Sequence, residues 1–149
     1  MEKEFVPYEL ALRLKDLEFY CDCFGDYFKF GNQEPFLVTD DDRYRIEEDN
    51  EEEDVLRVPA PTFSQAFRWF RDKHRMFHEV FIDTEPTIDD PDKLEFKYLI
   101  LHMVGIEHMY TDKIKGKRFD TYEEAELACL ERLIDKITNK KIFDFVTDL

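Results

Sequence analysis

The chain has 149 residues, a formal net charge of −15, 15 phenylalanines, 7 tyrosines and only 4 glycines. This length favours a single domain of residues 1–149 with an aromatic core. The negative charge disfavours nucleic acid and anionic membranes as partners, and the shortage of glycine disfavours a glycine-rich phosphate loop.

No apolar run approaches the roughly 20 residues that a membrane helix needs. The first residues, Met1-Glu2-Lys3-Glu4-Phe5, lack the charged and then apolar arrangement of a signal peptide. An odd number of cysteines without an export signal is typical of a reducing compartment. We therefore expect a cytoplasmic protein with no membrane segment.

The first half of the chain predicts a helix followed by three strands. Pro7 suits the start of a short amphipathic helix over residues 7–18, with its leucines on one face. Residues 27–30 and 36–39 are predicted strands joined through Gly31 and Asn32, a typical hairpin turn. A third strand over residues 55–58 ends at a proline pair.

Between the second and third strands lies a concentrated acidic segment, Asp40–Asp54. It carries ten acids against Arg43 and Arg45. Tyr44 and Arg45 stand where a calcium loop needs a ligand and a glycine, so we predict a mobile loop instead of a calcium site. Its acids form a candidate surface for a basic partner protein, with Asp40, Asp41, Asp42, Glu47, Glu48 and Asp49 as the candidate contacts.

The second half begins and ends with helices that carry the same start signal. Thr62 with Gln65, and Thr121 with Glu124, form capping boxes for helices to about residue 75 and about Ile137. In each box, the Glu or Gln side chain is expected to reach back to the amide of the capping threonine. Asn139 and the nearby lysines suit the end of the last helix, and residues 142–146 are predicted to dock as a tail.

Strands are predicted between these two helices. They run through residues 80–82, over 94–104 and over 106–110, with a loop over 84–92 and an exposed turn over 113–118. The outline is α-βββ-α-βββ-α. We predict an α+β fold in which antiparallel sheet carries helices packed on one face. The repeated threonine starts are consistent with a duplication or with convergent capping.

A zinc site is disfavoured by spacing. Cys21 and Cys23 are closer than the usual pair of zinc-binding cysteines, and His74 and His78 lie about 50 residues away with no second cysteine pair. We expect His74 to pack in the core beside Phe63 and Phe67, and Cys129 to be a small apolar filler. We predict no metal and no cofactor.

Two chemical alternatives remain open. Arg68, Arg71 and Arg75 form a basic stripe that could bind phosphate or nucleic acid, although the overall charge makes nucleic acid an unlikely partner. A small metal-dependent hydrolase could use the acids around residues 83–95. Those acids are Asp83, Glu85, Asp89, Asp90 and Glu95.

Glu126 falls within the apolar arc of the last predicted helix. A carboxyl group buried there would have a raised pKa and could act as a catalytic acid. A Glu at the edge of the sheet, or one paired with an arginine, is the ordinary interpretation.

Three patches carry a resemblance to a known group of proteins. Residues Val6–Leu17, Ala60–Arg71 and Thr121–Leu130 resemble short uncharacterised proteins of Bacteroides-type gut bacteria and their phages. The resemblance implies a phage or prophage origin and action in the host cytoplasm. It supplies no catalytic residues, because that group has no assigned activity.

Together, the sequence predicts a non-enzymatic protein-interaction protein, in the setting of a phage accessory factor. Its predicted partner surface comprises the acidic segment and the arginine stripe. The sequence shows no catalytic motif, no serine-centred elbow and no glycine-rich phosphate loop.

Overall fold

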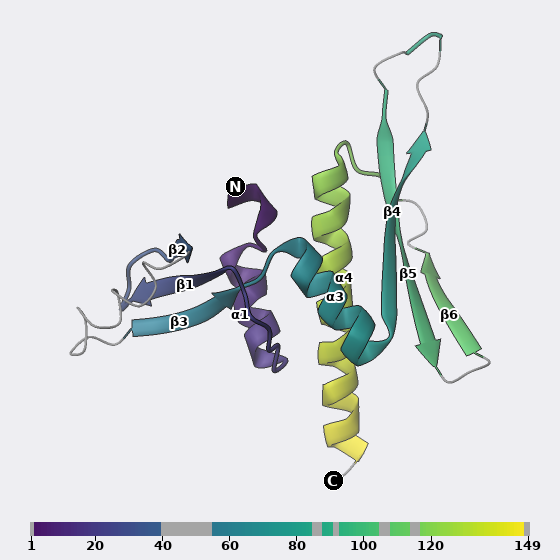
Figure 1. Cartoon of the computed structure of the whole chain (residues 1–149). Coiled ribbons are helices and arrows are strands. Elements are labelled where there is room, and N and C mark those ends of the chain that lie inside the picture. The colour runs from purple at the N-terminus through teal and green to yellow at the C-terminus, as the bar shows by residue number, and fades with distance from the viewer. Residues whose placement is uncertain are drawn as a thin grey trace. The chain divides into compact units, whose positions relative to one another are not determined.

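The structure is a computed structural model that describes residues 2–39, 55–84, 88–90, 93–104, 108–113 and 117–147. These residues gather into two compact units, Met1–Trp69 and Phe70–Leu149. The order of helices and strands follows the predicted α-βββ-α-βββ-α outline, which confirms an α+β fold (Figure 1). A single domain stays a prediction, and the acidic segment at residues 40–54 lies outside the described residues.

The first unit contains a three-stranded antiparallel sheet with the strand order β2-β1-β3. A hairpin joins β1 and β2 as predicted, with Gly31 at a φ of +49°. Helix α1 contacts β3. The elements of this unit are η1 (Glu2–Glu4), α1 (Tyr8–Asp16), β1 (Gly25–Phe30), β2 (Phe36–Thr39), β3 (Val55–Ala60) and the start of α3 (Phe63–His74).

Helix α1 ends in a Schellman motif. The amide of Phe19 donates to the carbonyl of Leu14 at 3.0 Å, and the amide of Glu18 donates to the carbonyl of Lys15 at 2.9 Å. Glu18 adopts the left-handed conformation with a φ of 63°. Leu14 and Phe19 are both buried, which is the apolar pairing that usually accompanies this motif.

The segment before α1 is held to the sheet and to the chain before α3. The amide of Val6 donates to the carbonyl of Pro61 at 2.9 Å, and the hydroxyl of Tyr27 donates to the carbonyl of Val6 at 2.8 Å. Phe5 and Thr62 also form an antiparallel bridge. These contacts bring the N-terminal residues and the start of α3 together within the first unit.

Helix α3 begins with the predicted capping box. Gln65 Oε1 accepts from the amide of Thr62 at 3.0 Å, and Thr62 Oγ1 accepts from the amide of Gln65 at 3.3 Å. Each side chain thereby satisfies a backbone donor that the first helical turn leaves without a partner. The helix ends at His74, and Arg75 follows with a φ of 55°.

The second unit contains a three-stranded antiparallel sheet with the strand order β4-β5-β6. Helix α4 contacts both β4 and β5, so it packs on one face of this sheet, as predicted (Figure 1). The elements are β4 (Met76–Thr84), β5 (Glu95–Val104), β6 (His108–Lys113) and α4 (Tyr122–Thr147). Strand β4 is longer than the predicted residues 80–82, and β6 lies slightly later than the predicted 106–110.

Helix α4 corrects two predictions. It continues to Thr147 instead of ending near Ile137, so residues 142–146 are helical and do not form a separate tail. Lysine and asparagine near a helix end are preferences only, and no glycine or proline follows Asn139 to stop the helix.

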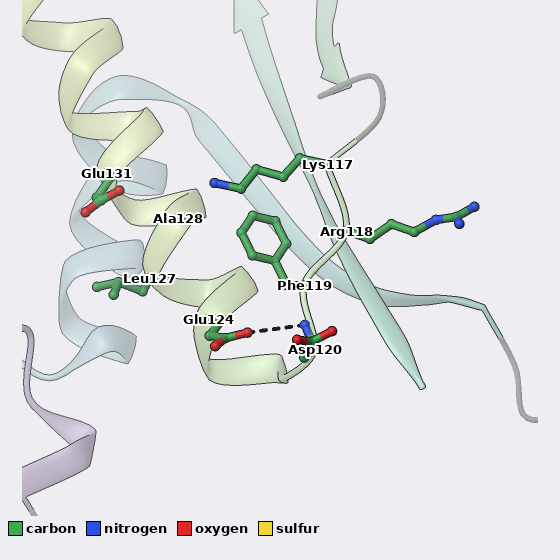
Figure 2. A pocket seen from close by; sticks show the side chains of 8 residues that line it. All are labelled: Lys117, Arg118, Phe119, Asp120, Glu124, Leu127, Ala128 and Glu131. Carbon is green, nitrogen blue, oxygen red and sulfur yellow. Dashed lines mark hydrogen bonds between the residues drawn. The ribbon is translucent and has the colours of Figure 1, made fainter. Parts of the chain in front are cut away.

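The start of α4 differs slightly from a standard capping box. The amide of Glu124 donates to Thr121 Oγ1 at 3.1 Å, as predicted. Glu124 Oε2, however, accepts from the amide of Asp120 at 3.2 Å, one residue before the predicted partner (Figure 2). The turn that precedes the helix is thereby fixed together with its first residues.

The two βββα runs do not share a topology. In the first run, the first strand in sequence, β1, lies at the centre of its sheet. In the second run, the second strand in sequence, β5, lies at the centre. The repeated element order is therefore not accompanied by a repeated strand order. The shared threonine starts fit convergent capping better than a copied sheet.

Candidate functional site

Among the described residues, one face of the sheet β4-β5-β6 packs against α4, and the opposite face carries partly exposed aromatic side chains and is called the open face below. In an antiparallel sheet, residues opposite one another point to the same side, and the side alternates along each strand. Met76, Tyr98 and Ile100 are buried and belong to the face toward α4. Phe77 and Phe81 lie on β4 at odd spacing from Met76, so they point to the opposite face, where they are 37% and 38% exposed. They mark the open face.

The open face has an apolar centre. Phe77 lies opposite Leu101, and the next residues of β5 on the same side are Leu99 and Met103. These three β5 residues are half-buried. Glu79, opposite Leu99, is the charged residue that interrupts the centre from β4. Large apolar residues on an open sheet face are typical of a surface that another molecule covers.

A cluster of ion pairs closes one end of the open face. Asp83 Oδ2 accepts from Lys97 Nζ at 2.9 Å and from Arg118 Nε at 2.7 Å. Arg118 Nη1 also lies 3.3 Å from Glu95 Oε2, and Lys93 Nζ lies 4.0 Å from Glu95 Oε1. The hydrogen bond from Lys97 is the largest cause that lowers the pKa of Asp83, and Arg118 adds to it.

This cluster bears on the predicted metal-dependent hydrolase. Asp83 and Glu95 do come together, but lysine and arginine already occupy their carboxylate oxygens. Asp89 and Asp90 are exposed, and Glu85 lies outside the described residues. Among the residues that the structure describes, no group of three or more His, Cys, Asp or Glu side chains is placed to hold a metal ion.

The predicted partner surface is only partly described. Its acids, Asp40, Asp41, Asp42, Glu47, Glu48 and Asp49, lie outside the described residues. Arg68 and Arg71 are exposed on α3, and Arg71 Nε lies 3.6 Å from Asp72 Oδ1. Arg75 lies just past the helix end in the left-handed conformation, so the helical spacing that predicted a three-arginine stripe does not extend to it.

Glu126 sits in α4 with part of its side chain buried. Burial raises its pKa, and the nearby Glu123 carboxylate raises it further. Burial, together with Glu126, raises the pKa of Cys129 to about 12, so this thiol is protonated at neutral pH. Cys129 is fully buried, as expected of an apolar filler.

Three histidines with described side chains, His74, His78 and His102, are partly buried. The His74 ring packs against Phe70 with a centroid distance of 5.9 Å. The predicted packing beside Phe63 and Phe67 stays a prediction. His78 belongs to the α4 face of β4, opposite Ile100. Burial, with Arg71 as a second cause, lowers the pKa of His78 to about 4. Burial and the α4 lysines Lys136 and Lys140 likewise lower the pKa of His102.

A pocket of about 380 Å³ lies beside the start of α4. Figure 2 shows its lining, in which Lys117 Nζ lies 5.1 Å from the centre of the Phe119 ring. Glu124, one of the carboxylates in the lining, accepts from the Asp120 amide. Lys117, Asp120 and Glu131 also line the pocket, so charged groups of both signs surround it.

Cys21 and Cys23 form a close pair of reduced thiols, with 2.7 Å between their Sγ atoms. Sequence spacing alone disfavoured zinc here and indicated no other chemistry. The feature that it missed is a tight turn at Asp22, which a loop assignment does not predict. It also missed the open sheet face, although the alternation of Phe77, Glu79 and Phe81 carried that signal.

Comparison with protein-family models, curated proteins and solved structures finds no match for this chain. None of the helices in the described parts of the chain is long and apolar enough to cross a bilayer.

Proposed function

We propose that this chain is a non-enzymatic interaction protein and that the open face of the β4-β5-β6 sheet binds a partner protein. The observation that carries the proposal is the partial exposure of Phe77 and Phe81 beside the half-buried side chains of β5. Burying such aromatic residues under a partner would remove apolar surface from water, which favours association.

The layout of the face fits a protein partner better than a small ligand. An apolar centre with a charged rim is the usual anatomy of a protein interface. Here the rim is the ion-pair cluster around Asp83 and Glu95, where Lys97 and Arg118 balance the two carboxylates. Small-molecule sites are instead concave, and this face is a sheet surface.

The partner that we propose has a basic surface. The chain carries a net charge of −15, and the segment Asp40–Asp54 contains ten of its 36 acids. Such a field accelerates association with a positively charged protein and repels nucleic acid. The resemblance to phage proteins sets the proposal in a host cytoplasm, where the chain would act as an accessory factor on a host protein.

The test is affinity capture from a Bacteroides lysate with three forms of the full chain. These are the wild type, the double variant Phe77→Ser/Phe81→Ser, and Tyr20→Ser as a matched loss of an exposed aromatic, since Tyr20 is 81% exposed. We expect the wild type and Tyr20→Ser to enrich the same basic protein, and the double variant to lose it at least roughly tenfold. Circular dichroism confirms that each variant is folded.

Equal capture by the double variant would contradict the sheet face as the binding surface. Sedimentation of the purified wild type identifies self-association: a dimer that the double variant abolishes would make the partner a second copy and contradict the basic partner. Deleting residues 40–54 tests the acidic segment separately. Unchanged capture after that deletion would exclude it as a docking surface.

A further inference from the structure

The two cysteines before β1 are brought together by a three-residue turn. The amide of Cys23 donates to the carbonyl of Cys21 at 2.9 Å, which closes a γ-type turn around Asp22. The Sγ atoms lie 2.7 Å apart, although both residues are reduced thiols. A disulfide needs its two cysteines to start close together, and this turn meets that need with little backbone movement.

The turn is fixed from outside by helix α3. Gln65 Nε2 donates to the carbonyl of Asp22 at 3.0 Å. The other end of the same amide group, Gln65 Oε1, accepts from the amide of Thr62 in the capping box. One side chain therefore holds both the start of α3 and the conformation in which the two thiols meet.

The two thiols differ in their access to solvent. Cys21 is exposed, whereas Cys23 is 8% exposed. Both line a cavity of about 600 Å³ in the first unit, together with Lys15, Asp22, Asp26, Arg57 and Pro59. In this wall, Arg57 Nη2 donates to Asp26 Oδ2 at 3.0 Å, and Lys15 Nζ donates to the carbonyl of Arg57 at 2.9 Å. The cavity is thus large enough for a small molecule to reach Cys21, and its rim holds both cations and carboxylates.

We propose that Cys21 and Cys23 are a dithiol site that exchanges with a low-molecular-weight disulfide and closes into an intramolecular disulfide. This activity is separate from partner binding by the β4-β5-β6 sheet, and neither depends on the other.

The exchange proceeds in two balanced steps. Cys21 loses its proton, and its thiolate attacks one sulfur of the disulfide R–S–S–R. A Cys21–S–S–R bond forms, and R–S⁻ leaves and takes up a proton. Cys23 then loses its proton and attacks Cys21 Sγ, which forms the Cys21–Cys23 bond and releases the second R–S⁻ to be protonated. Two protein thiols are oxidised, and one disulfide is reduced to two small thiols.

The assignment of roles follows from exposure and from the hydrogen bond between the thiols. The exposed Cys21 is the attacking group, and the buried Cys23 resolves the mixed disulfide. Hydrogen bonding from Cys23 is the largest cause that lowers the pKa of Cys21, against opposing effects of burial and Asp22. A larger thiolate fraction at neutral pH speeds attack.

The test uses the full reduced chain and glutathione disulfide at neutral pH, with acid quenching and mass spectrometry. We expect a transient adduct of one glutathione on Cys21, followed by a product that is two hydrogens lighter than the starting chain. Peptide mapping should place the new bond between Cys21 and Cys23, with Cys129 still a thiol. Cys129→Ala is the matched control and should behave as the wild type.

Two variants separate the steps. Cys23→Ala should stop at the glutathione adduct of Cys21, and Cys21→Ala should form an adduct at least roughly tenfold more slowly, because Cys23 is buried. The proposal is overturned if the wild type keeps both thiols, if it forms only disulfide-linked dimers, or if both single variants react at the same rate. The wild-type time course decides the matter even if Cys23→Ala does not fold.

Discussion

Arg118 Nε donates a 2.7 Å hydrogen bond to Asp83 Oδ2, which ties the segment before α4 to the end of β4. The same guanidinium lies 3.3 Å from Glu95 on the neighbouring strand. Phe119, the next residue, pairs with Phe96 through two backbone hydrogen bonds of 2.8 and 3.0 Å. One short segment thus extends the sheet beyond the end of β6 and carries the guanidinium that contacts two carboxylates.

Replacing Asp83 with asparagine should destabilise the chain at neutral pH, and the loss of stability should become smaller in acid. The pKa of Asp83 is lowered in the folded state, chiefly by the hydrogen bond from Lys97. A carboxyl group of this kind stabilises the fold above its unfolded pKa of about 4 and loses that contribution as pH falls through its folded pKa. Urea unfolding at pH 7 and at pH 2.5 measures both effects.

Asp89→Asn is the matched control for this change, because Asp89 is an exposed acid in the loop between β4 and β5. It should change stability much less than Asp83→Asn at pH 7. An equal loss in the two variants at pH 7, or a loss at Asp83 that does not shrink as pH falls below about 4, would show that the ion pairs do not support this end of the sheet.

His78 should make the protein less stable as pH falls from about 6.5 to about 4. Burial lowers its pKa to about 4 from an ordinary 6.5. In that window the unfolded chain binds a proton that the folded chain does not, so the free energy of unfolding decreases. The shift corresponds to roughly 2–3 kcal/mol once partial exposure is considered.

The variant His78→Leu removes this titration and should flatten the stability profile between pH 7 and pH 4. A leucine suits this position, because His78 lies opposite Ile100 on the face of β4 that packs against α4. The pKa itself is measured by following the His78 ring signals by NMR across the same range. A midpoint near 6.5 in the folded protein would contradict the burial of this imidazole.

Local chemistry predicted the elements well, and for identifiable reasons. The capping residues Thr62 and Thr121 locate two helix starts, because a first turn needs acceptors for its amides. Strand alternation located β5. The end of α4 was wrong because lysines and an asparagine permit a helix end without requiring one, and no residue after Asn139 breaks the helix.

The candidate sites depended on contacts that sequence spacing does not encode. Asp83 and Glu95 were two of the five acids considered as a metal site, but the sequence did not show that they come together. Their pairing with Arg118 comes from a strand register and a bridge at Phe119. Likewise, Cys21 and Cys23 meet because Gln65, 43 positions away from Asp22, holds the turn between them. Contacts between residues this far apart in the sequence are set by tertiary packing.

Glu18→Gly should stabilise the protein by about 0.5–1 kcal/mol. Glu18 has a φ of 63° after α1, in the conformation that glycine adopts without a Cβ penalty. The Schellman hydrogen bonds use only backbone atoms, so the substitution keeps them. The midpoint of thermal or urea unfolding measures the gain.

Asp16→Gly is the matched control, since Asp16 is an exposed residue inside the last turn of α1. There glycine should cost about 0.5–1 kcal/mol, because it loses more backbone entropy on folding. If glycine stabilises the protein at position 18 and destabilises it at position 16, the left-handed conformation of Glu18 explains the gain, and a general tolerance of glycine does not. The same sign in both variants would contradict the helix end as described.

Cys23→Ala should raise the pKa of Cys21 toward its ordinary value. The hydrogen bond between the two thiols is the largest cause that lowers this pKa, and the thiol atoms lie 2.7 Å apart. The rate of alkylation of Cys21 by iodoacetamide follows its thiolate fraction, so the pH midpoint of that rate reports the pKa. A Cys129→Ala background leaves Cys21 as the one thiol in the variant.

The variant Asp22→Asn should lower the pKa of Cys21, which is the opposite of the change expected in Cys23→Ala. The Asp22 carboxylate raises the pKa of Cys21, whereas the contact with Gln65 uses the backbone carbonyl of Asp22 and survives the substitution. The alkylation midpoint should therefore fall in Asp22→Asn and rise in Cys23→Ala. The stabilisation of the Cys21 thiolate by Cys23 is contradicted if the alkylation midpoints of the two variants shift in the same direction. It is also contradicted if the chain that retains Cys23 and Asp22 has a midpoint at the ordinary value of about 8.5. Cys21 would then lack the larger thiolate fraction from which its attacking role is inferred.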